Sequence, residues 1–335
     1  MDMVVALLVM VVGVAMAGEP TPSMDLVMPG AHPTKNDDYL CSSFDVSNMT
    51  GGMEPVHVTG FVPHAKANKA HHMLLYTCGE PNREPGVVYD CLHHSMCRSQ
   101  QSIMFAWAKN APATSLPQGV SFTVNPKVAR YLVLQIHYAH PLEEKDHTGL
   151  SLTYQRSETK YRAGILLMVL GRLTIPANTA TTHGDINCKL PSPVPLHMFG
   201  YRTHAHGLST VITGYVYNEE GHKYRQIAAG SPQWPQAFYP MKKVNTVQPE
   251  EVVTARCTYN STGVTHDTHI GSTAGDEMCN LYIMYFTGTT QLFTPIYPKY
   301  DNTVVCRGGC QPWGLPGVWG GAGGPRYHPG TPLRQ

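Results

Sequence analysis

Short apolar runs recur along the whole chain, rich in β-branched and aromatic residues and separated by clusters of Gly, Pro, Asn and Asp. Runs of this length between turn-forming residues predict β-strands at the spacing of a β-sandwich, and no long stretch has the period of an amphipathic helix. The clearest predicted strands cover residues 130–138, 165–170, 209–217, 251–259 and 280–286. The pattern therefore predicts an all-β protein with many turns.

The predicted strands form two series, one on each side of a polar, charged segment at residues 155–162. Domain boundaries tend to fall in such segments, and a chain of 335 residues suits one large domain or two ordinary ones. We therefore expect an N-terminal domain over residues 18–158 and a C-terminal domain over residues 159–310. The Gly- and Pro-rich residues 311–335 are expected to form a flexible tail.

Residues 1–17 have the features of a signal peptide. Residues 4–16 are almost wholly apolar but too few to span a bilayer comfortably, and Ala15 and Ala17 supply the small-residue pattern that a signal peptidase reads. No other apolar run approaches about 18 residues, so we expect no transmembrane anchor. Sequons at Asn48 and Asn260 fit the same route. We expect the protein in the secretory pathway, in the granule lumen or outside the cell.

Composition narrows the possible functions. Hydrophobic residues make up 42% of the chain and charged residues 14%, so the chain is neither disordered nor fibrous. A net charge of +1 removes the electrostatic case for binding nucleic acid. The 18 histidines indicate metal chemistry. Because a chain of this length can bury a sizeable core unaided, a bound metal need not be merely structural.

The nine cysteines fall into an N-terminal group of four and a C-terminal group of five. In a secreted chain without recurring CxxC pairs, disulfides are a better interpretation than zinc ligands. The odd number leaves one thiol over, which we expect at the Cys306 and Cys310 end.

Three histidine clusters lie on predicted strands. The first is the adjacent pair His71 and His72, the second contains His137, and the third contains His204 and His206. A lone histidine is usually a surface or hydrogen-bonded residue, but three clusters on strands favour a metal site. Neutral imidazole binds zinc, copper, iron or nickel, so histidine alone does not name the ion.

The third cluster is the most telling because side chains alternate along a strand. Arg202, His204 and His206 therefore project from one face, which places two imidazoles within reach of one ion. His71 and His72 would point to opposite faces of a regular strand, so both could reach one ion only where the backbone twists or bulges.

Five sequence blocks surround these clusters: HHMLLY at 71–76, AWAKNAP at 106–112, LVLQIHY at 132–138, PQAFYP at 235–240 and DEMCNLYIMY at 276–285. In this order they resemble the copper type II, ascorbate-dependent monooxygenases, and within that family the peptidylglycine-hydroxylating members. The blocks span nearly all of the mature chain, and together they are highly specific.

The resemblance implies two jelly-roll-like antiparallel β-sandwich domains, each carrying one copper ion across a solvent-filled cleft. The electron-donating copper of the first domain would be bound by three imidazoles, those of His71, His72 and His137. The oxygen-activating copper of the second domain would be bound by two imidazoles and a thioether, those of His204, His206 and Met278. Three nitrogen ligands suit both Cu(I) and Cu(II), whereas a thioether favours the softer Cu(I), which must meet O₂.

The resemblance also implies how a peptide binds. Arg202 matches the residue that grips the terminal carboxylate, a task suited to a planar, two-pronged donor. The pocket around the C-terminal glycine would be formed by Asn280, Tyr282, Ile270 and Met284. Gln135 and Tyr39 match residues near the copper sites, but ordinary strand packing explains these two, and Ile270, nearly as well. The implied disulfides pair Cys41 with Cys91, Cys78 with Cys97, Cys257 with Cys279, and Cys188 with Cys306 or Cys310.

The implied activity is hydroxylation of the α-carbon of a C-terminal glycine in peptides, the first step of peptide amidation. It would use O₂ and two electrons from ascorbate, one through each copper. No lyase domain follows in the sequence, so we expect a separate lyase to act on the hydroxyglycine product.

Three alternatives are weaker. A dopamine β-monooxygenase-like hydroxylase of small aromatic amines would leave a buried Arg202 unpaired, because an amine has no carboxylate. A non-catalytic secreted copper-binding protein would need neither six ligands nor a carboxylate clamp. A zinc hydrolase would suit three histidines, but it would not suit a methionine ligand and two separate sites.

Overall fold

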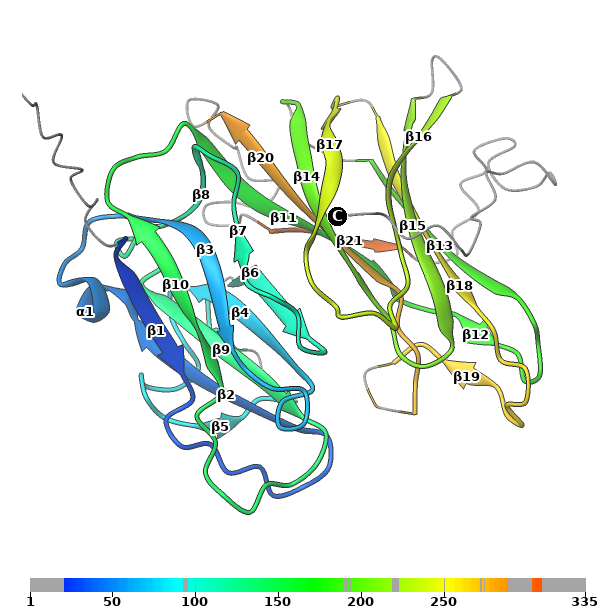
Figure 1. The fold of residues 1–335 in the computed structure, drawn as a ribbon, viewed down its shortest axis with the longest axis horizontal. Helices are drawn as coiled ribbons and strands as arrows, with labels where there is room; N and C mark the ends of the chain where they lie inside the picture. Colours follow the sequence, from blue (N-terminus) through cyan, green and yellow to red (C-terminus); the bar gives the residue numbers. More distant parts are fainter. Residues whose placement is uncertain are drawn as a thin grey trace, which may run out of the picture.

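Strands dominate the computed structural model and form four sheets (Figure 1). The residues described are 21–92, 96–99, 101–189, 192, 194–218, 223–249, 251–271, 273, 275–288 and 303–308. Within them α1 (Val46–Thr50) is the only helix, and no helix of this part of the chain has the length and apolarity needed to span a membrane. The predicted all-β class is confirmed.

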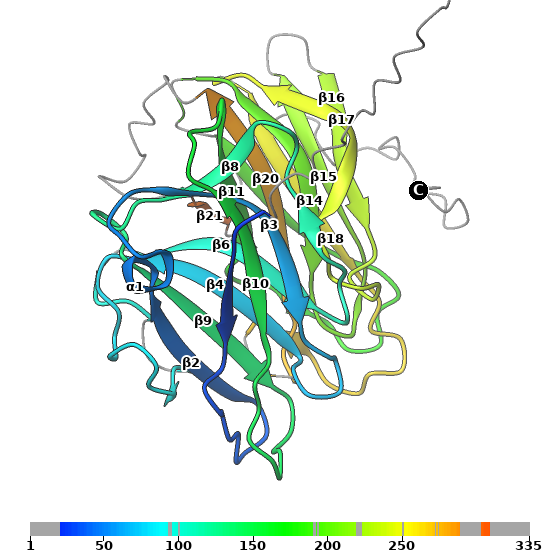
Figure 2. The same ribbon diagram turned by 60° about the vertical axis from the view of Figure 1, so that its left-hand side comes forward.

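The N-terminal half is a sandwich of two antiparallel layers. One sheet contains, in spatial order, β5 (Tyr89–Asp90), β2 (Asp38–Asp45), β9 (Tyr131–Tyr138), β4 (His72–Cys78) and β6 (Gln101–Ala108). The other layer contains β1 (Ser23–Val27), β10 (Gly149–Gln155), β3 (Val56–His64) and β8 (Val120–Val124), with β7 (Thr114–Ser115) paired to β3. Figure 2 shows β1, β10 and β3 side by side in this second layer. Phe61 of β3 stacks on Phe105 of β6, so the two layers share one apolar core.

The C-terminal half repeats this two-layer plan. Its first layer contains, in spatial order, β11 (Tyr161–Leu170), β20 (Asn280–Gly288), β14 (Leu196–His204) and β17 (Tyr239–Val247). Its second layer contains β13 (Thr182–Lys189), β18 (Val252–Tyr259), β15 (Ser209–Asn218) and β16 (Lys223–Gly230). A short ribbon pairs β12 (Thr174–Ile175) with β19 (Thr268–His269). A second apolar cluster fills the space between the layers.

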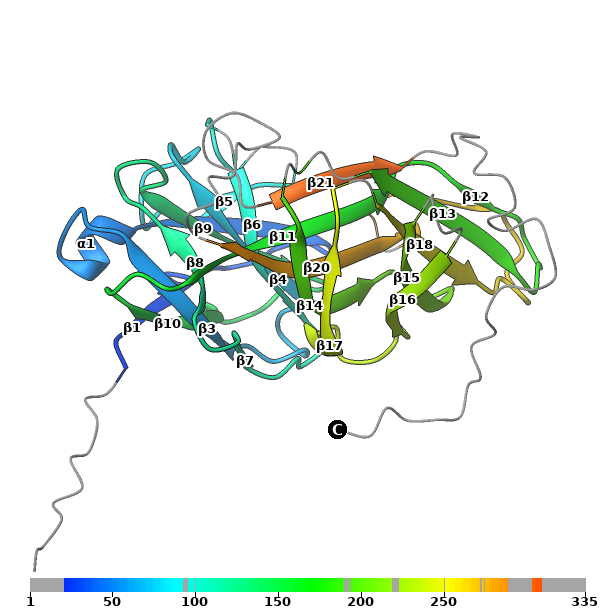
Figure 3. The same ribbon diagram turned by 90° about the horizontal axis from the view of Figure 1, so that it is seen from above.

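The two halves are joined through β11, which runs along the middle of the molecule (Figure 3). β8 of the N-terminal half pairs with the start of β11 in parallel, so one ten-stranded sheet crosses both halves. β21 (Thr303–Gly308) also lies parallel to β11. All other strand pairs in the described part of the chain are antiparallel. Continuous backbone pairing therefore sets the placement of the halves relative to each other, and with it the placement of the histidine clusters.

Each of the five clearest predicted strands is present. Four of them differ from their predicted limits by at most two residues, whereas β11 begins at Tyr161, inside the polar segment 155–162. The pairing with β8 explains this difference, because it supplies backbone partners to Tyr161 and Arg162 that side-chain polarity does not reveal. Residues 1–17 and 311–335, for which a signal peptide and a tail were expected, lie outside the described residues.

The structure forms three of the disulfides that the resemblance implied, Cys41–Cys91, Cys78–Cys97 and Cys257–Cys279. Cys188 is disulfide-bonded as well. Its two expected partners, and with them the expected free thiol, fall outside the side chains that the structure describes. The bridge to Cys279 fixes the backbone next to Met278.

Candidate metal centre

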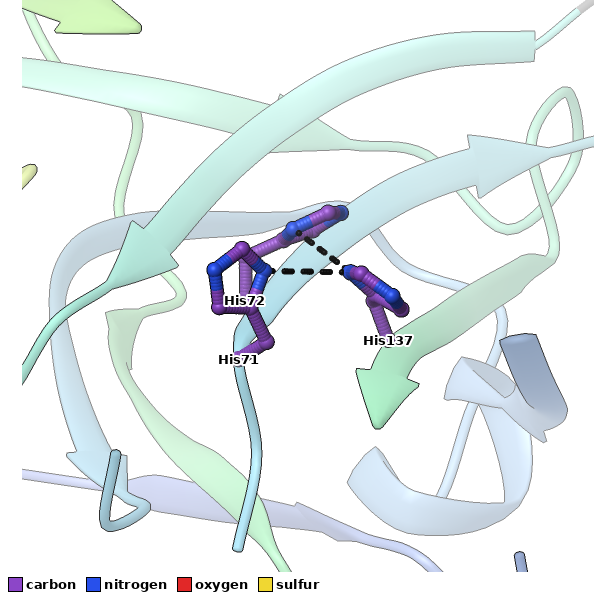
Figure 4. Close-up of side chains that lie close together, drawn as sticks. All are labelled: His71, His72 and His137. Carbon is purple, nitrogen blue, oxygen red and sulfur yellow. Dashed lines mark hydrogen bonds between the residues drawn. The ribbon is translucent and has the colours of Figure 1, made fainter. Parts of the chain in front are cut away.

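Three imidazoles of the N-terminal half converge on one point (Figure 4). The Nδ1 atom of His137 lies 3.1 Å from Nδ1 of His71 and 3.3 Å from Nδ1 of His72. Two nitrogens bound to one ion at about 2.0 Å with tetrahedral angles would lie about 3.3 Å apart. The three side chains therefore fit a single ion with little rearrangement.

The local backbone explains how two adjacent histidines reach the same point. β4 begins only at His72, which lies opposite His137 of β9. His71 precedes the strand and is held separately, because its N–H donates to the carbonyl of His137 at 2.8 Å. It is therefore not subject to the alternation of side chains along β4. The sequence indicated that a twist or a bulge would be needed to bring both imidazoles to one ion, and in the structure the start of β4 between the two residues allows it.

Burial keeps these imidazoles neutral, as metal ligands must be. It lowers the pKa of His71 to about 4, with the neighbouring His137 as the next cause. It also brings the pKa of His72 well below the ordinary histidine value. For His137 burial again lowers the pKa, although Asp37 opposes the shift. At neutral pH all three rings can therefore offer nitrogen lone pairs to a cation.

Asp37 orients His137 from behind. The Nε2–H of His137 donates to Oδ1 of Asp37 at 2.9 Å, which leaves Nδ1 as the lone-pair atom facing the other two rings. Tyr39 stacks on the same ring with 4.2 Å between centroids. The sequence matched Tyr39 to a residue near the copper sites but missed Asp37. The one available signal was its place just before β2, whose Tyr39 pairs with His137.

Asp37→Asn should weaken metal binding at the three-histidine site by roughly 10- to 100-fold, the usual effect of losing a carboxylate behind a ligand histidine. Metal affinity is measured by competition with a chelator, on wild type and variant. The matched control is Asp25→Asn, because Asp25 is an exposed carboxylate of the same half that accepts from Ser151. Equal affinities for wild type and Asp37→Asn would exclude the orienting role.

In the C-terminal half one glutamine connects Arg202 and His204. This residue is Gln236, and its Oε1 atom accepts from Nδ1–H of His204 at 2.6 Å and from Nη2–H of Arg202 at 3.2 Å. The two side chains therefore share a face of β14, as strand alternation predicted. His206 lies just beyond the strand, where its Nδ1–H donates to the carbonyl of Asp276 at 2.7 Å. Both imidazoles thus keep Nε2 free for a ligand.

Glu277 ties the segment of His206 to that of Met278. Its buried carboxylate accepts from the backbone N–H of His206 at 3.0 Å and of Met278 at 3.1 Å. The Met278 sulfur accepts from Nδ2–H of Asn280 at 3.7 Å. The sequence quoted Gln236 and Glu277 only as parts of motifs and gave them no role. Their function in positioning became visible only with their contacts.

The expected substrate contacts lie on β14 and β20, two neighbouring strands. Arg202 is directly opposite Tyr282, and its guanidinium carbon lies 4.9 Å from the centre of the tyrosine ring. Asn280 is directly opposite His204. Residues opposite each other in a ladder face the same side of the sheet. The anion-binding candidate and the second histidine pair therefore lie side by side.

The other matched residues are more dispersed. Met284, further along β20, lines a separate groove of about 430 Å³ together with Phe199 and Phe238. Ile270 forms a bridge with Glu277 and packs against the C-terminal core. Gln135 points its amide at the sulfur of Met96, 3.4 Å away, rather than at the histidines.

Both histidine sets line one cavity of about 280 Å³. The ring centroids of His72 and His204 are only 5.9 Å apart. The resemblance implied sites on opposite sides of a solvent-filled cleft, and in the structure the two histidine sets line this cavity from the two halves. Lys109 of the N-terminal half reaches across to the carbonyl of Pro232 at 3.0 Å and helps to hold the two sides together. Arg202 does not line the cavity, because Gln236 lies between them.

The metal-free protein should lose stability as the pH falls from about 6.5 towards about 4. His71 has a lowered pKa in the folded state, so in this window the unfolded chain binds more protons and acid favours unfolding. Urea midpoints at pH 7 and pH 5 measure the effect. His71→Gln removes one of these titrating groups and should show a smaller loss between the two pH values. An equal or larger loss in the variant would contradict this assignment.

Sequence comparisons place both halves in one family. The model of the copper type II ascorbate-dependent monooxygenase N-terminal domain matches residues 24–145, and that of the C-terminal domain matches residues 161–304. Among solved structures, a chain of the empty particles of cowpea mosaic virus has 9% identity and a TM-score of 0.32, and covers 82% of this chain and 95% of its own. That likeness is too weak to carry an argument.

Curated relatives agree with the family models. Peptidyl-glycine alpha-amidating monooxygenase A of Xenopus laevis is 39% identical over 79% of this chain and 28% of its own length. The mouse peptidyl-glycine alpha-amidating monooxygenase is 38% identical over 79% of this chain and 27% of its own length. The human DBH-like monooxygenase protein 1 is 26% identical over 76% of this chain and 45% of its own length. The chain thus spans little more than a quarter of the length of the first two relatives.

Proposed function

Because the chain belongs to the copper type II ascorbate-dependent monooxygenases, we propose that it hydroxylates the α-carbon of a C-terminal glycine in peptides, with O₂ and ascorbate as co-substrates. The proposal assigns one copper ion to His71, His72 and His137, and a second to His204, His206 and Met278. It also assigns the two halves to two domains that meet near residue 158. The bound copper ions would supply one-electron storage and oxygen activation.

The buried guanidinium of Arg202 is the observation that carries this proposal. The side chain is 1% exposed, yet its Nη1 atom has no hydrogen-bond partner. Its other contacts are to neutral groups, the carbonyl and amide oxygens of Gln236 and the side chain of Tyr282. A buried cation without an anionic partner is costly, so such sites normally receive one. A terminal carboxylate matches the two-pronged geometry of this donor.

The residues around Arg202 suit a glycine that is held by its carboxylate. Tyr282 covers one face of the guanidinium and limits the approach of water. Asn280 lies opposite His204 on the next strand, which places an amide donor beside the second histidine pair. Gln236 would have to release Nη2 of Arg202 when the carboxylate arrives. It would still hold Nδ1 of His204, which keeps that ring oriented.

An amine substrate fits this arrangement less well. A small aromatic amine would bring a second positive charge towards a buried guanidinium and would leave Nη1 unpaired. The same charge argues against a non-catalytic copper-binding protein, which would not need an anion-binding group beside its metal site.

The proposal extends to the surroundings of the protein. The disulfides support an oxidising compartment, and we assign the protein to the secretory pathway or the extracellular space. The hydroxyglycine product would pass to a lyase activity that releases the amide. Nucleic acid is not a partner in this proposal, because the net charge is only +1.

A mass-spectrometric assay tests the proposed reaction. Purified protein is incubated with copper, ascorbate, ¹⁸O-labelled O₂ and a glycine-extended peptide. A product that has gained one labelled oxygen atom on the terminal glycine is expected. The same peptide ending in an amide serves as the control and should not react. Equal oxidation of both peptides, or oxidation only of an aromatic amine, would overturn the proposal.

A further inference from the structure

We propose that Lys109 forms the binding site for the ascorbate anion, inside the cavity that the two histidine sets share. The assignment rests on the ascorbate dependence of the proposed function and names the residue through which the reductant is recognised. Among the described residues that line this cavity, Lys109 is the only lysine or arginine. The only acidic residue of the lining is Asp37, whose carboxylate already accepts from His137.

The backbone holds Lys109 in an uncommon conformation at the end of β6. Lys109 and the following Asn110 both have positive φ values, 53° and 57°, which residues other than glycine seldom adopt. The buried Trp107 secures the turn through its indole N–H, which donates to the carbonyl of Ala111 at 2.8 Å. Asn110 accepts from the backbone N–H of Ala67 at 2.8 Å. Residues held in such sparsely populated backbone conformations cluster at functional sites, where they fix the direction of a side chain.

This turn places the ammonium beside the first metal site. β6 pairs with β4 so that Ala108 lies opposite His72, which brings the next residue, Lys109, to the edge of the three-histidine site. The charge on Lys109 contributes to the low pKa of His71, as expected of two groups that lie close together. An anion held by Lys109 would therefore lie next to the proposed electron-accepting copper.

The ammonium forms no ion pair with any carboxylate of the described residues. It donates to two neutral oxygens, the carbonyl of Pro232 at 3.0 Å and Oε1 of Gln233 at 3.4 Å. No carboxylate of the described residues lies within ion-pair distance of it. Burial lowers the pKa of Lys109, the nearby charge of Arg202 lowers it further, and the more distant carboxylate of Glu277 opposes the shift. A bound anion would stabilise the protonated form, and the third ammonium hydrogen is available to donate to it.

Ascorbate matches this site better than the peptide does. It is a small, flat monoanion at neutral pH, and the cavity of about 280 Å³ can receive it. The peptide carboxylate already has a candidate partner in Arg202, on the far side of Gln236. In the reaction, ascorbate gives one electron to the oxidised copper of the three-histidine site and one proton to water, and leaves as the ascorbyl radical anion.

Reduction of copper in the absence of peptide tests the site separately from hydroxylation. The oxidised, copper-loaded protein is mixed with ascorbate, and loss of the Cu(II) signal is followed by rapid-freeze electron paramagnetic resonance. Lys109→Gln should raise the half-saturating ascorbate concentration roughly 10- to 100-fold, since a charge-assisted hydrogen bond is lost. Lys109→Arg should restore most of the difference. Uncharged hydroquinone should reduce wild type and Lys109→Gln equally fast.

A matched control and a copper-free measurement complete the test. Lys66→Gln changes an exposed lysine of the same half outside the cavity and should behave as wild type. Anaerobic titration calorimetry with copper-free protein should detect ascorbate binding to wild type and not to Lys109→Gln. Unchanged half-saturation in Lys109→Gln would overturn the proposal. A raised KM of Lys109→Gln for the glycine-extended peptide, with normal copper reduction, would also overturn it, because Lys109 would then bind the peptide carboxylate.

The outcomes also separate this inference from the proposed function. If no peptide is hydroxylated but copper reduction and ascorbate binding still depend on Lys109, the reductant site stands and the peptide substrate is wrong. If hydroxylation proceeds and Lys109→Gln changes neither ascorbate binding nor copper reduction, the reductant site is wrong and the proposed function stands.

Discussion

Met278→Leu should abolish peptide hydroxylation while leaving the fold and the three-histidine site intact. Leucine keeps most of the side-chain volume and removes only the sulfur, so the packing cost is small. The backbone at this position is held without the side chain, because the Met278 N–H donates to Glu277 and its carbonyl accepts from Tyr259 at 2.9 Å. Loss of a ligand at the proposed oxygen-activating site would remove several kcal/mol of transition-state stabilisation, so we expect a rate of roughly one hundredth of the wild-type rate or less.

The measurements are the hydroxylation rate, the copper content and the melting temperature of the variant. Met168→Leu is the matched control, because Met168 is a fully buried methionine of the C-terminal core away from the histidines. It should retain nearly full activity. A Met278→Leu enzyme with the wild-type rate would remove Met278 from the ligand set.

Arg202→Ala should raise the KM for a glycine-extended peptide roughly 10- to 150-fold. A charge-assisted bidentate contact contributes about 1.5–3 kcal/mol, and about 1.4 kcal/mol corresponds to a factor of ten in affinity. Arg202→Lys should recover only part of the loss, since an ammonium cannot reproduce the planar fork. Steady-state kinetics with peptides of increasing concentration measure the effect.

Two comparisons test whether the raised KM of Arg202→Ala comes from a disturbed metal site or fold instead of a lost carboxylate contact. Arg202 shares Gln236 with His204, so copper binding of the variant is measured alongside its kinetics. Arg256→Lys is the matched control, because Arg256 pairs with Asp185 at 2.7 Å on the other layer of the C-terminal half. It should leave the KM unchanged. If Arg202→Ala bound the glycine-extended peptide as tightly as wild type does, the carboxylate would have to be recognised elsewhere.

Most of the strands could be predicted because each carries its own local pattern. β9, β15, β18 and β20 follow the apolar runs closely. The start of β11 could not be predicted in this way. Its first residues are polar, and their pairing with β8 depends on a strand some 40 positions earlier in the chain. Side-chain patterns report burial, whereas backbone pairing between distant segments leaves no such trace.

The candidate site divides in the same manner. Spacing alone placed Arg202 and His204 on one face, because alternation is a local property of a strand. Asp37, Gln236 and Glu277 act through hydrogen bonds that join segments far apart in sequence. Carboxylate and amide side chains are common, so nothing in the sequence distinguished these three from the others in the chain.

The sequence by itself determined the all-β class, the residues of the histidine clusters and the three cysteine pairs that the family motifs implied. These follow from local periodicity and from motifs that each lie within a few residues. Only the tertiary structure decided that both histidine sets line one cavity and that Arg202 is buried without an anionic partner. It also decided that Lys109 of the N-terminal half enters this cavity and contacts Pro232 of the C-terminal half. The physical reason is that each of these features depends on contacts between segments that lie far apart along the chain, such as the pairing of β8 with β11 that joins the two sandwiches and the contact of Gln236 with Arg202.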